Sequence, residues 1–476
     1  MSAPVLQLPV REVLALYQRR KLSPVEVMEA CLKQILKYNP VLNAFSFLDE
    51  KHALRQARGS EKRWMRNEPV GTLDGIPVTI KDWFHHKGWP TRYGSLVSSP
   101  ISQPEDSPPV ARLREQGAIF IGKTTLPEYG HKGVTHSPLT GITRNPWNMA
   151  RTSGGSSGGA AVAATTGMGL LHLGSDAGGS IRIPASFSGA FGFKPSPGLV
   201  PSWPPSLFSS LSAVGPLVRS VDDAALMLDV LMQPDGRDWH ALPLPPPNFS
   251  AALKKPLQPL RIAYAASINN VSATPEVLEV LKSVRQKLEV LGKVEEVTLN
   301  VPWLVDVFNK HWSAVASYSV AELNTREKKK LDPRYLYWAA QGDALPLHDY
   351  LQAERDRMTI GEYFKGLLDN YDILVTPTTA MTAFEAGVDM PTTDKGKPHA
   401  LHVKQAWDDW TPFTYPANLA KLPAASLPAG ISKEGLPVGL QVMGGFLKDA
   451  LVLQACKRLE EELAFKPWLS AQSADS

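Results

Sequence analysis

The chain has 476 residues, of which 43% are hydrophobic and 20% charged, and its formal net charge is +4 at neutral pH. These values are typical of a globular protein with enough apolar material for a large core, and they do not favour a nucleic-acid partner. Only Cys31 and Cys456 are present, which excludes a disulfide framework and a Cys-x-x-Cys metal site and favours a reducing cytoplasm. The sequence contains no run of eighteen apolar residues, which is the pattern that would indicate a membrane span.

The first sixty or so residues have the pattern of helices. Ser23 is expected as an N-cap, with Pro24 at the first helical position and Glu26 completing a capping box. Cys31 then falls on the apolar face of the same helix. We therefore assign this cysteine to packing and not to catalysis.

A strand is expected in the stretch "GTLDGIPVTIKDWF", residues 71–84. Its aliphatic residues stand at alternate positions after a turn-like Asp-Gly pair. Lys81 ends the strand on the face opposite those aliphatic residues. A lone lysine at a strand end is usually solvated, so this position alone does not indicate function.

The stretch "GAIFIGKTT", Gly117 to Thr125, matches the phosphate-loop pattern of nucleotide triphosphatases. A true phosphate loop follows a strand and precedes a helix whose N-terminus faces the phosphate. Here a predicted helix from about Ser107 precedes the first glycine, "AIFI" is itself strand-like, and "LPEYG" follows. The context does not fit ATP binding, and Lys123 is not expected to contact phosphate.

The remaining elements continue an α/β alternation. Ser220 and Asp223 form an expected capping box for the helix in "SVDDAALMLDVL", and the basic run "REKKK" at 326–330 is read as a solvated helix face. Residues 303–368 have a mostly helical pattern, and strands are expected in "LRIAYAA", "YDILVTPTT" and "GLPVGLQVMG". We divide the chain into a helical segment at about 1–65, a catalytic core at about 66–232, a Pro-rich connector at about 233–260, a variable substrate-shaping region at about 261–400 and a C-terminal return to the core at about 401–476.

The Gly/Ser-rich stretch "TSGGSSGGAAVAA", residues 152–164, combines a bendable backbone with a strong helix former. A plain packing turn is one interpretation. A second is the nucleophile elbow Gly-x-Ser-x-Gly, but the residues before it are polar and interrupted by proline, where an elbow needs a buried strand. His240, His311 and His399 could supply its base, yet none has a supporting local pattern.

A third glycine-rich stretch, "GSDAGGSIR", places Ser180 directly after two glycines. Successive backbone N–H groups without bulky side chains can converge on a developing oxyanion, so Ser180 is a candidate nucleophile. Serine needs a base, and no histidine lies in this stretch. Lys81 could serve if burial lowered its pKa by several units from the ordinary value of about 10.4.

These stretches together resemble the amidase signature family. The resemblance is carried by "GGSSGGAAVAA", "GSDAGGSIRIPASFSGAFGFKPS" and "LDGIPVTIKD", and it extends in order through most of the chain except about 239–368. It implies one α/β domain, 1–476, built on a large mixed β-sheet covered by α-helices on both sides, and a reaction without metal or organic cofactor. Thr125 stands where the family usually has Asn, which affects only a local hydrogen bond.

The resemblance also implies a role for each site residue. Ser180 would be the nucleophile, Lys81 the base and Ser156 the bridging serine held in a cis peptide. Asp176 and Arg182 would form a structural ion pair, and Ser157 would add a hydrogen bond. The oxyanion hole would consist of the backbone N–H groups of Ala177, Gly178, Gly179 and Ser180.

The expected activity is hydrolysis of a small apolar or aryl amide through an acyl-enzyme. Two alternatives remain: a glutamine-hydrolysing subunit of a tRNA-dependent amidotransferase, and an inactive scaffold. A small-molecule amide is the expected partner, without nucleic acid or membrane, and a homodimer is possible. An apolar substrate is suggested by the tryptophans Trp303, Trp312, Trp338 and Trp407, while the adjacent His85 and His86 do not form a metal site.

Overall fold

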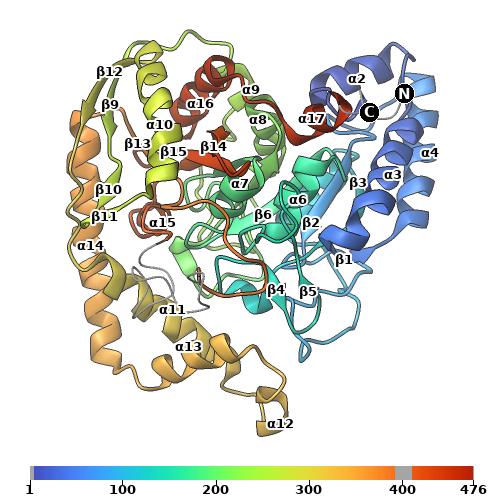
Figure 1. The fold of residues 1–476 in the computed structure, drawn as a ribbon. Helices are drawn as coiled ribbons and strands as arrows, with labels where there is room; N and C mark the ends of the chain where they lie inside the picture. Colours follow the sequence, from blue (N-terminus) through green and yellow to red (C-terminus); the bar gives the residue numbers. More distant parts are fainter. Residues whose placement is uncertain (1–4, 392–409, 475–476) are drawn as a thin grey trace.

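An eleven-stranded mixed sheet forms the centre of the computed structural model, which describes residues 5–391 and 410–474 (Figure 1). The strand order is β1-β3-β2-β6-β8-β7-β14-β15-β13-β9-β12. β3, β2 and β6 pair in parallel, as do β13, β9 and β12, and the other pairs are antiparallel. The strands are β1 (Phe45–Leu48), β2 (Pro77–Lys81), β3 (Ile119–Thr124), β6 (Leu171–Asp176), β7 (Phe191–Lys194), β8 (Ala213–Val218), β9 (Leu260–Tyr264), β12 (Gly292–Glu296), β13 (Ile373–Pro377), β14 (Ala424–Ile431) and β15 (Pro437–Gly444).

Helices cover both faces of this sheet. α6 and α7 pack on one face and α8, α10 and α16 on the other. On β15, Gly439 faces Ser186 of α7, whereas Gly444, an odd number of residues along the strand, faces Val452 of α16. The longer helices are α2 (Val10–Gln18), α3 (Pro24–Leu42), α4 (Glu50–Arg66), α5 (Pro108–Glu115), α6 (Gly158–Thr166), α7 (Arg182–Ser188), α8 (Val221–Leu231), α10 (Pro275–Lys287), α11 (Leu304–Val320), α13 (Pro333–Asp343), α14 (Leu347–Asn370), α16 (Asp449–Leu463) and α17 (Trp468–Ala474).

Short elements connect these helices and strands. They are β4 (His136–Ser137), β5 (Gly141–Ile142), α9 (Phe249–Ala252), β10 (Ser267–Ile268), β11 (Val271–Ser272), α12 (Thr325–Lys328) and α15 (Tyr415–Leu419). Within residues 5–391 and 410–474, no helix is both long and apolar enough to cross a membrane.

Most of the predicted elements are confirmed, with two differences, one in the N-terminal segment and one at the start of α8. β2 ends at Lys81, and Ser23 and Glu26 form the predicted capping box. The helical N-terminal segment also contains the edge strand β1, which was not predicted. Ser220 caps α8, but the Asp223 carboxylate accepts the backbone N–H of Val10 at 2.8 Å, so it ties α2 to α8.

Residues 304–370 form helices that pack beside the sheet, as the sequence pattern predicts. α11 lies against both α13 and α14 (Figure 1). Buried aromatic side chains, among them Phe308, Trp312 and Phe364, form a second hydrophobic cluster there, separate from the main core. This cluster brings α11 next to the turn that follows β6, since a methyl group on Gly178 would lie 2.6 Å from Phe308 Cζ.

Candidate active site

The candidate catalytic residues meet where β2 and β6 end side by side. The two strands pair in parallel, so their carboxyl ends lie at the same edge. Lys81 is the last residue of β2, and Ser175 and Asp176 are the last two of β6. The turn after β6 carries Ser180 to the start of α7. The sheet topology therefore joins segments about a hundred residues apart.

Lys81 is buried, with 1% of its surface exposed, and contacts two serine hydroxyls. Its Nζ lies 2.7 Å from Ser156 Oγ and 3.0 Å from Ser175 Oγ. Burial lowers the pKa of Lys81 to about 7, although the negative charge of Asp176 acts in the opposite direction. A substantial fraction of this lysine is therefore neutral at pH 7 and able to accept a proton.

Ser156 stands just before α6 and is tied to the turn after β6. The peptide bond between Gly155 and Ser156 is cis. The next residue, Ser157, donates its backbone N–H to the carbonyl oxygen of Ser180 at 3.1 Å and its hydroxyl to the carbonyl oxygen of Ser175 at 3.2 Å. These bonds hold the Gly/Ser stretch against the strand end that faces Lys81.

The turn after β6 carries Ser180, a residue that is 7% exposed, and presents backbone N–H groups beside it. Gly179 has a φ of +129°, a conformation that L side chains rarely adopt. The Gly179 N–H donates to Asp176 Oδ1 at 2.7 Å. It therefore already has an acceptor, which differs from the expectation that this N–H contributes to the oxyanion hole. The N–H groups of Ala177, Gly178 and Ser180 donate to no acceptor among the described residues.

A buried ion pair between Asp176 and Arg182 supports this turn. Arg182 Nη2 and Nε donate to the two carboxylate oxygens at 2.9 and 3.0 Å. The guanidinium also donates to Thr414 O, Gln441 Oε1 and Asn418 Oδ1, each within 2.7 Å. Burial alone would raise the pKa of the Asp176 carboxyl, but the charge and hydrogen bonds of Arg182 hold it well below its usual range.

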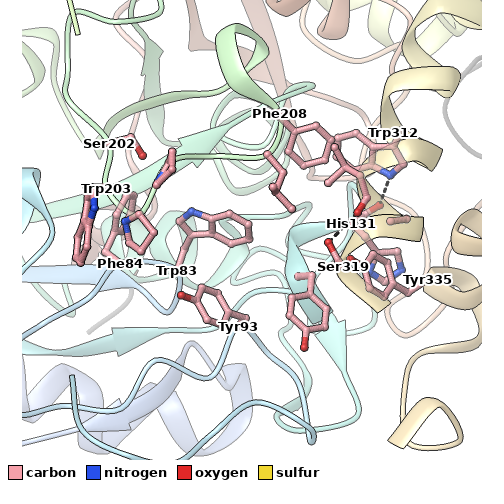
Figure 2. Close-up of a pocket in the computed structure, with 16 residues that line it drawn as sticks. Trp83, Phe84, Tyr93, His131, Ser202, Trp203, Phe208, Trp312, Ser319 and Tyr335 are labelled. Atoms are coloured by element: carbon pink, nitrogen blue, oxygen red, sulfur yellow. Dashed lines mark hydrogen bonds between the residues drawn. The ribbon is translucent and has the colours of Figure 1, made fainter. Parts of the chain in front are cut away.

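An aromatic cavity of about 220 Å³ is lined by residues that follow β2, by residues of α11 and by residues of the segment 202–208 (Figure 2). None of its described lining residues is Asp, Glu, Lys or Arg. The one titratable base among them, His131, is kept neutral because burial lowers its pKa to about 4. The aromatic lining residues are Trp83, Phe84, Tyr93, Tyr129, Trp203, Phe208, Trp312 and Tyr335.

Two close approaches relate this cavity to the candidate catalytic residues. A methyl group on Gly130 would lie 3.3 Å from Ser156 Oγ and 3.8 Å from the Trp83 ring. On the other side, Phe308, which touches Gly178, stacks on Trp312 with ring centroids 5.2 Å apart. Trp83 and Trp312 therefore place the cavity near Ser156 and near the turn that carries Ser180, although neither serine is among its described lining residues.

The structure separates the four tryptophans that suggested an apolar substrate. Trp312 lines the cavity. Trp303 precedes α11 and is 56% exposed, and Trp338 is buried in the helical cluster without lining the cavity. Trp407 lies outside the described residues. The interpretation of Trp303 as a pocket residue is wrong, because α11 begins after it and directs later residues inward.

Other residues of the cavity and site were not predicted from the sequence. Ser175 contacts Lys81, and its place at the end of β6 was the signal that could have found it. Trp83 follows Lys81 by two residues and could have been included on proximity alone. Tyr129 lies in the quoted stretch "LPEYG" but was given no role there, and Phe208 reaches the cavity from a segment without a motif.

Lys123 lies in β3 and is fully buried. Its Nζ lies 3.3 Å from Asp82 Oδ1 and donates to Thr91 Oγ1 at 2.6 Å. Burial lowers its pKa to about 8, against the effect of the Asp82 charge. The lysine of the apparent phosphate loop is therefore part of an interior ion pair.

The histidines are spread over separate environments. His85 Nε2 lies 3.0 Å from the Tyr93 hydroxyl, while His86 stacks on Trp89. His311 pairs with Glu354 and His240 lies near Ser209, so neither has a contact with the Gly/Ser stretch in the described structure. His399 lies outside the described residues. No group of three or more His, Cys, Asp or Glu within 5–391 and 410–474 could hold a metal ion.

The chain is similar in sequence to known amidases over most of its length. A family model described as Amidase matches residues 26–453. An acylamidase from Rhodococcus erythropolis is 32% identical over 98% of each chain. A glutamyl-tRNA(Gln) amidotransferase subunit from Cyanothece sp. is 33% identical, over 96% of this chain and 98% of the relative.

Two solved structures that resemble this chain are also an acylamidase and an amidotransferase subunit. A bacterial aryl acylamidase of the amidase signature family superposes with a TM-score of 0.88 at 28% identity, over 99% of this chain and 98% of that chain. The corresponding glutamyl-tRNA(Gln) amidotransferase subunit from Thermotoga maritima superposes with a TM-score of 0.76 at 28% identity, over 96% of this chain and 95% of that chain.

Replacing Arg182 with leucine is expected to lower the free energy of unfolding by about 3–5 kcal/mol, because Asp176 would remain as an unpaired buried charge. Chemical denaturation at pH 7, followed by tryptophan fluorescence, measures this loss. The double variant Asp176→Asn with Arg182→Leu removes the buried charge and should recover part of the stability. A single variant as stable as the parent would show that the pair does not support the turn.

Proposed function

The chain belongs to the amidase signature family, whose enzymes hydrolyse amide C–N bonds, and we propose that it cleaves an uncharged aryl or other apolar carboxamide through Ser180, Ser156 and Lys81. The observation that carries this proposal is the aromatic cavity without formally charged lining residues beside a buried lysine–serine contact. The cavity supports the substrate class, and the lysine–serine contact supports the chemistry.

In the proposed reaction, neutral Lys81 takes the proton of the Ser156 hydroxyl while Ser156 takes that of Ser180. Ser180 Oγ then bonds to the amide carbon, and the carbonyl oxygen becomes an oxyanion. The N–H groups of Ala177, Gly178 and Ser180 would stabilise it, because they make no hydrogen bond to another described residue. Gly179 would support the turn through Asp176 in place of binding the oxyanion.

The intermediate collapses when the C–N bond breaks. The leaving nitrogen receives the proton by the reverse relay from Lys81 through Ser156, which leaves an ester between the acyl group and Ser180. Water, deprotonated by the same relay, attacks this ester and releases the carboxylic acid. The proton returns to Ser180 Oγ, so atoms and charges balance over one cycle.

A glutamine-hydrolysing subunit is the second candidate function, favoured by 33% identity to amidotransferase subunits over nearly the whole chain. Free glutamine carries an ammonium and a carboxylate, and transferring such charges from water into an apolar cavity is costly without partners. The described lining residues offer no countercharge for either group. This difference supports the apolar amide. An inactive scaffold is less favoured because Lys81 already contacts Ser156 in a buried site.

We expect kcat/KM for an uncharged anilide to exceed that for glutamine on the order of 100-fold, because a buried phenyl ring contributes about 2–3 kcal/mol and the glutamine charges lack partners. Steady-state assays of 4-nitroacetanilide, propionamide and glutamine with one enzyme preparation measure this ratio. Propionamide is the control for chemistry without a ring. Glutamine turnover exceeding that of the anilide would instead favour the amidotransferase function.

Replacing Ser180 with alanine should reduce kcat by about 10⁴-fold or more and abolish the acyl-enzyme, since the attacking oxygen is removed. Intact-protein mass spectrometry after rapid quenching with a slow anilide detects the acyl adduct in the parent enzyme. Ser153→Ala, a buried hydroxyl of the same region bonded only to a local carbonyl, serves as the matched control. An acyl adduct on Ser180→Ala would transfer the nucleophile to another residue.

The rate should depend on the protonation of Lys81. Because the pKa is lowered to about 7, the charged form dominates below pH 7 and cannot accept a proton. We therefore expect log kcat/KM to rise with unit slope below pH 7 and to level off above it. Initial rates from pH 5.5 to 9, with circular dichroism at each pH to verify folding, test this. A flat profile across the range would exclude Lys81 as the base.

A further inference from the structure

One wall of the aromatic cavity is a loop without regular secondary structure, residues 199–208. Six of the described lining residues come from it: Ser202, Trp203, Pro204, Pro205, Leu207 and Phe208. Figure 2 shows Trp203 beside Phe84 at one end of the cavity and Phe208 beside Trp312 at the other. The shape of the cavity therefore depends on where this loop is held.

Few hydrogen bonds join this loop to the rest of the described structure. Among the described residues, a single hydrogen bond joins residues 200–208 to a distant segment, and its donor is the backbone N–H of Ser202. The acceptor is Asp238 Oδ2 at 2.7 Å. The other bonds of the loop, such as that from Phe208 N–H to Ser206 Oγ, are local and cannot fix its position.

Asp238 belongs to the Pro-rich connector and is only 7% exposed. Its second oxygen accepts the backbone N–H of His240 at 2.9 Å, which orients the carboxylate. A buried carboxylate that accepts two backbone N–H groups makes stronger hydrogen bonds than a neutral acceptor would. The connector therefore holds Ser202 through a charged and preoriented group.

Arg237 contacts Trp203, the next residue of the loop. Its guanidinium carbon lies 5.2 Å from the centroid of the Trp203 ring, within the range of a cation–π contact. The guanidinium is itself fixed by Glu105 at 2.7 Å and Asp235 at 2.8 Å. Two consecutive connector residues thus contact two consecutive residues of the cavity wall.

We propose that Asp238 and Arg237 are positioning residues that determine the specificity of this enzyme for aryl substrates, by holding loop 199–208 in the conformation that completes the cavity. This inference rests on the proposed function in one respect, namely that the cavity receives the aromatic part of the amide. Neither residue touches Lys81, Ser156 or Ser180, so their effect is on binding and not on chemistry.

The physical consequence follows from the conformational equilibrium of the loop. Without Asp238 the Ser202 N–H loses its acceptor, and the loop populates conformations in which the cavity is incomplete. Apparent affinity falls in proportion to the binding-competent fraction. Loss of a hydrogen bond to a charged acceptor corresponds to a decrease of about tenfold. Asn in place of Asp238 keeps one carbonyl oxygen that can accept the Ser202 N–H, but its NH2 group then faces the His240 N–H, so it should restore only part of the affinity.

The kinetic test compares an aryl with an aliphatic amide. For Asp238→Ala, we expect KM for 4-nitroacetanilide to rise about tenfold with kcat within about twofold, and both constants for propionamide to stay unchanged. Asp238→Asn should lie between the parent and Asp238→Ala. Asp229→Ala is the matched control, because Asp229 accepts two backbone N–H groups at the other end of the connector and does not touch the loop. Equal losses in kcat for both amides would overturn the proposal.

A binding test separates this proposal from the proposed function. In the Ser180→Ala background, quenching of tryptophan fluorescence by 4-nitroacetanilide gives a dissociation constant without turnover. We expect it to rise about tenfold on adding Asp238→Ala and, should that variant fail to fold, about threefold on adding the surface change Arg237→Met. Absence of amide turnover would refute the function alone. Unchanged dissociation constants, or no binding of the anilide, would refute the positioning role.

Discussion

The buried ion pair between Asp176 and Arg182 is the interaction on which the rest of the site depends. It joins the end of β6 to the start of α7, and through Gln441 and Asn418 it reaches β15 and α15. A buried pair offsets its desolvation cost only when both groups have nearly complete hydrogen bonding, which is the case here. The turn between them is short, so its N–H groups are directed by the geometry of the pair.

The same pair also influences Lys81, the proposed base. Asp176 is the negative charge that favours protonated Lys81, and it opposes the effect of burial on the lysine pKa. Arg182 places a positive charge directly on that carboxylate, which reduces the field that Lys81 experiences. One interaction therefore shapes the turn that carries Ser180 and limits the stabilisation of charged Lys81. This double role explains why an arginine with five well-placed donors occupies the position, where a lysine could not make the same bonds.

The sequence could predict the parts of the site that are local in the chain. Alternation of aliphatic residues predicted β2 and placed Lys81 at its end, and glycines marked the turn before Ser180. The glycine-rich pattern made Ser180 a candidate nucleophile, whereas the role of Ser156 came from family resemblance alone. The bond from Gly179 to Asp176 and the aromatic cavity could not be predicted, because side-chain direction and the packing of Trp312 against Phe208 depend on how distant segments meet. The short edge strand β1 was not predicted, because four residues carry little periodicity.

Chemistry and specificity are thus built from different parts of the chain, yet they share one physical requirement, the exclusion of water. The Trp83 ring stands at the boundary between Ser156 and the aromatic cavity. An uncharged aromatic ligand that fills the cavity removes water from that boundary and strengthens the desolvation that keeps Lys81 neutral. A zwitterionic ligand would bring its own charge and hydration there, and a carboxylate near Lys81 would favour the protonated, inactive lysine. In the proposed function, the apolar wall would therefore select the substrate and keep the proposed base neutral by the same effect.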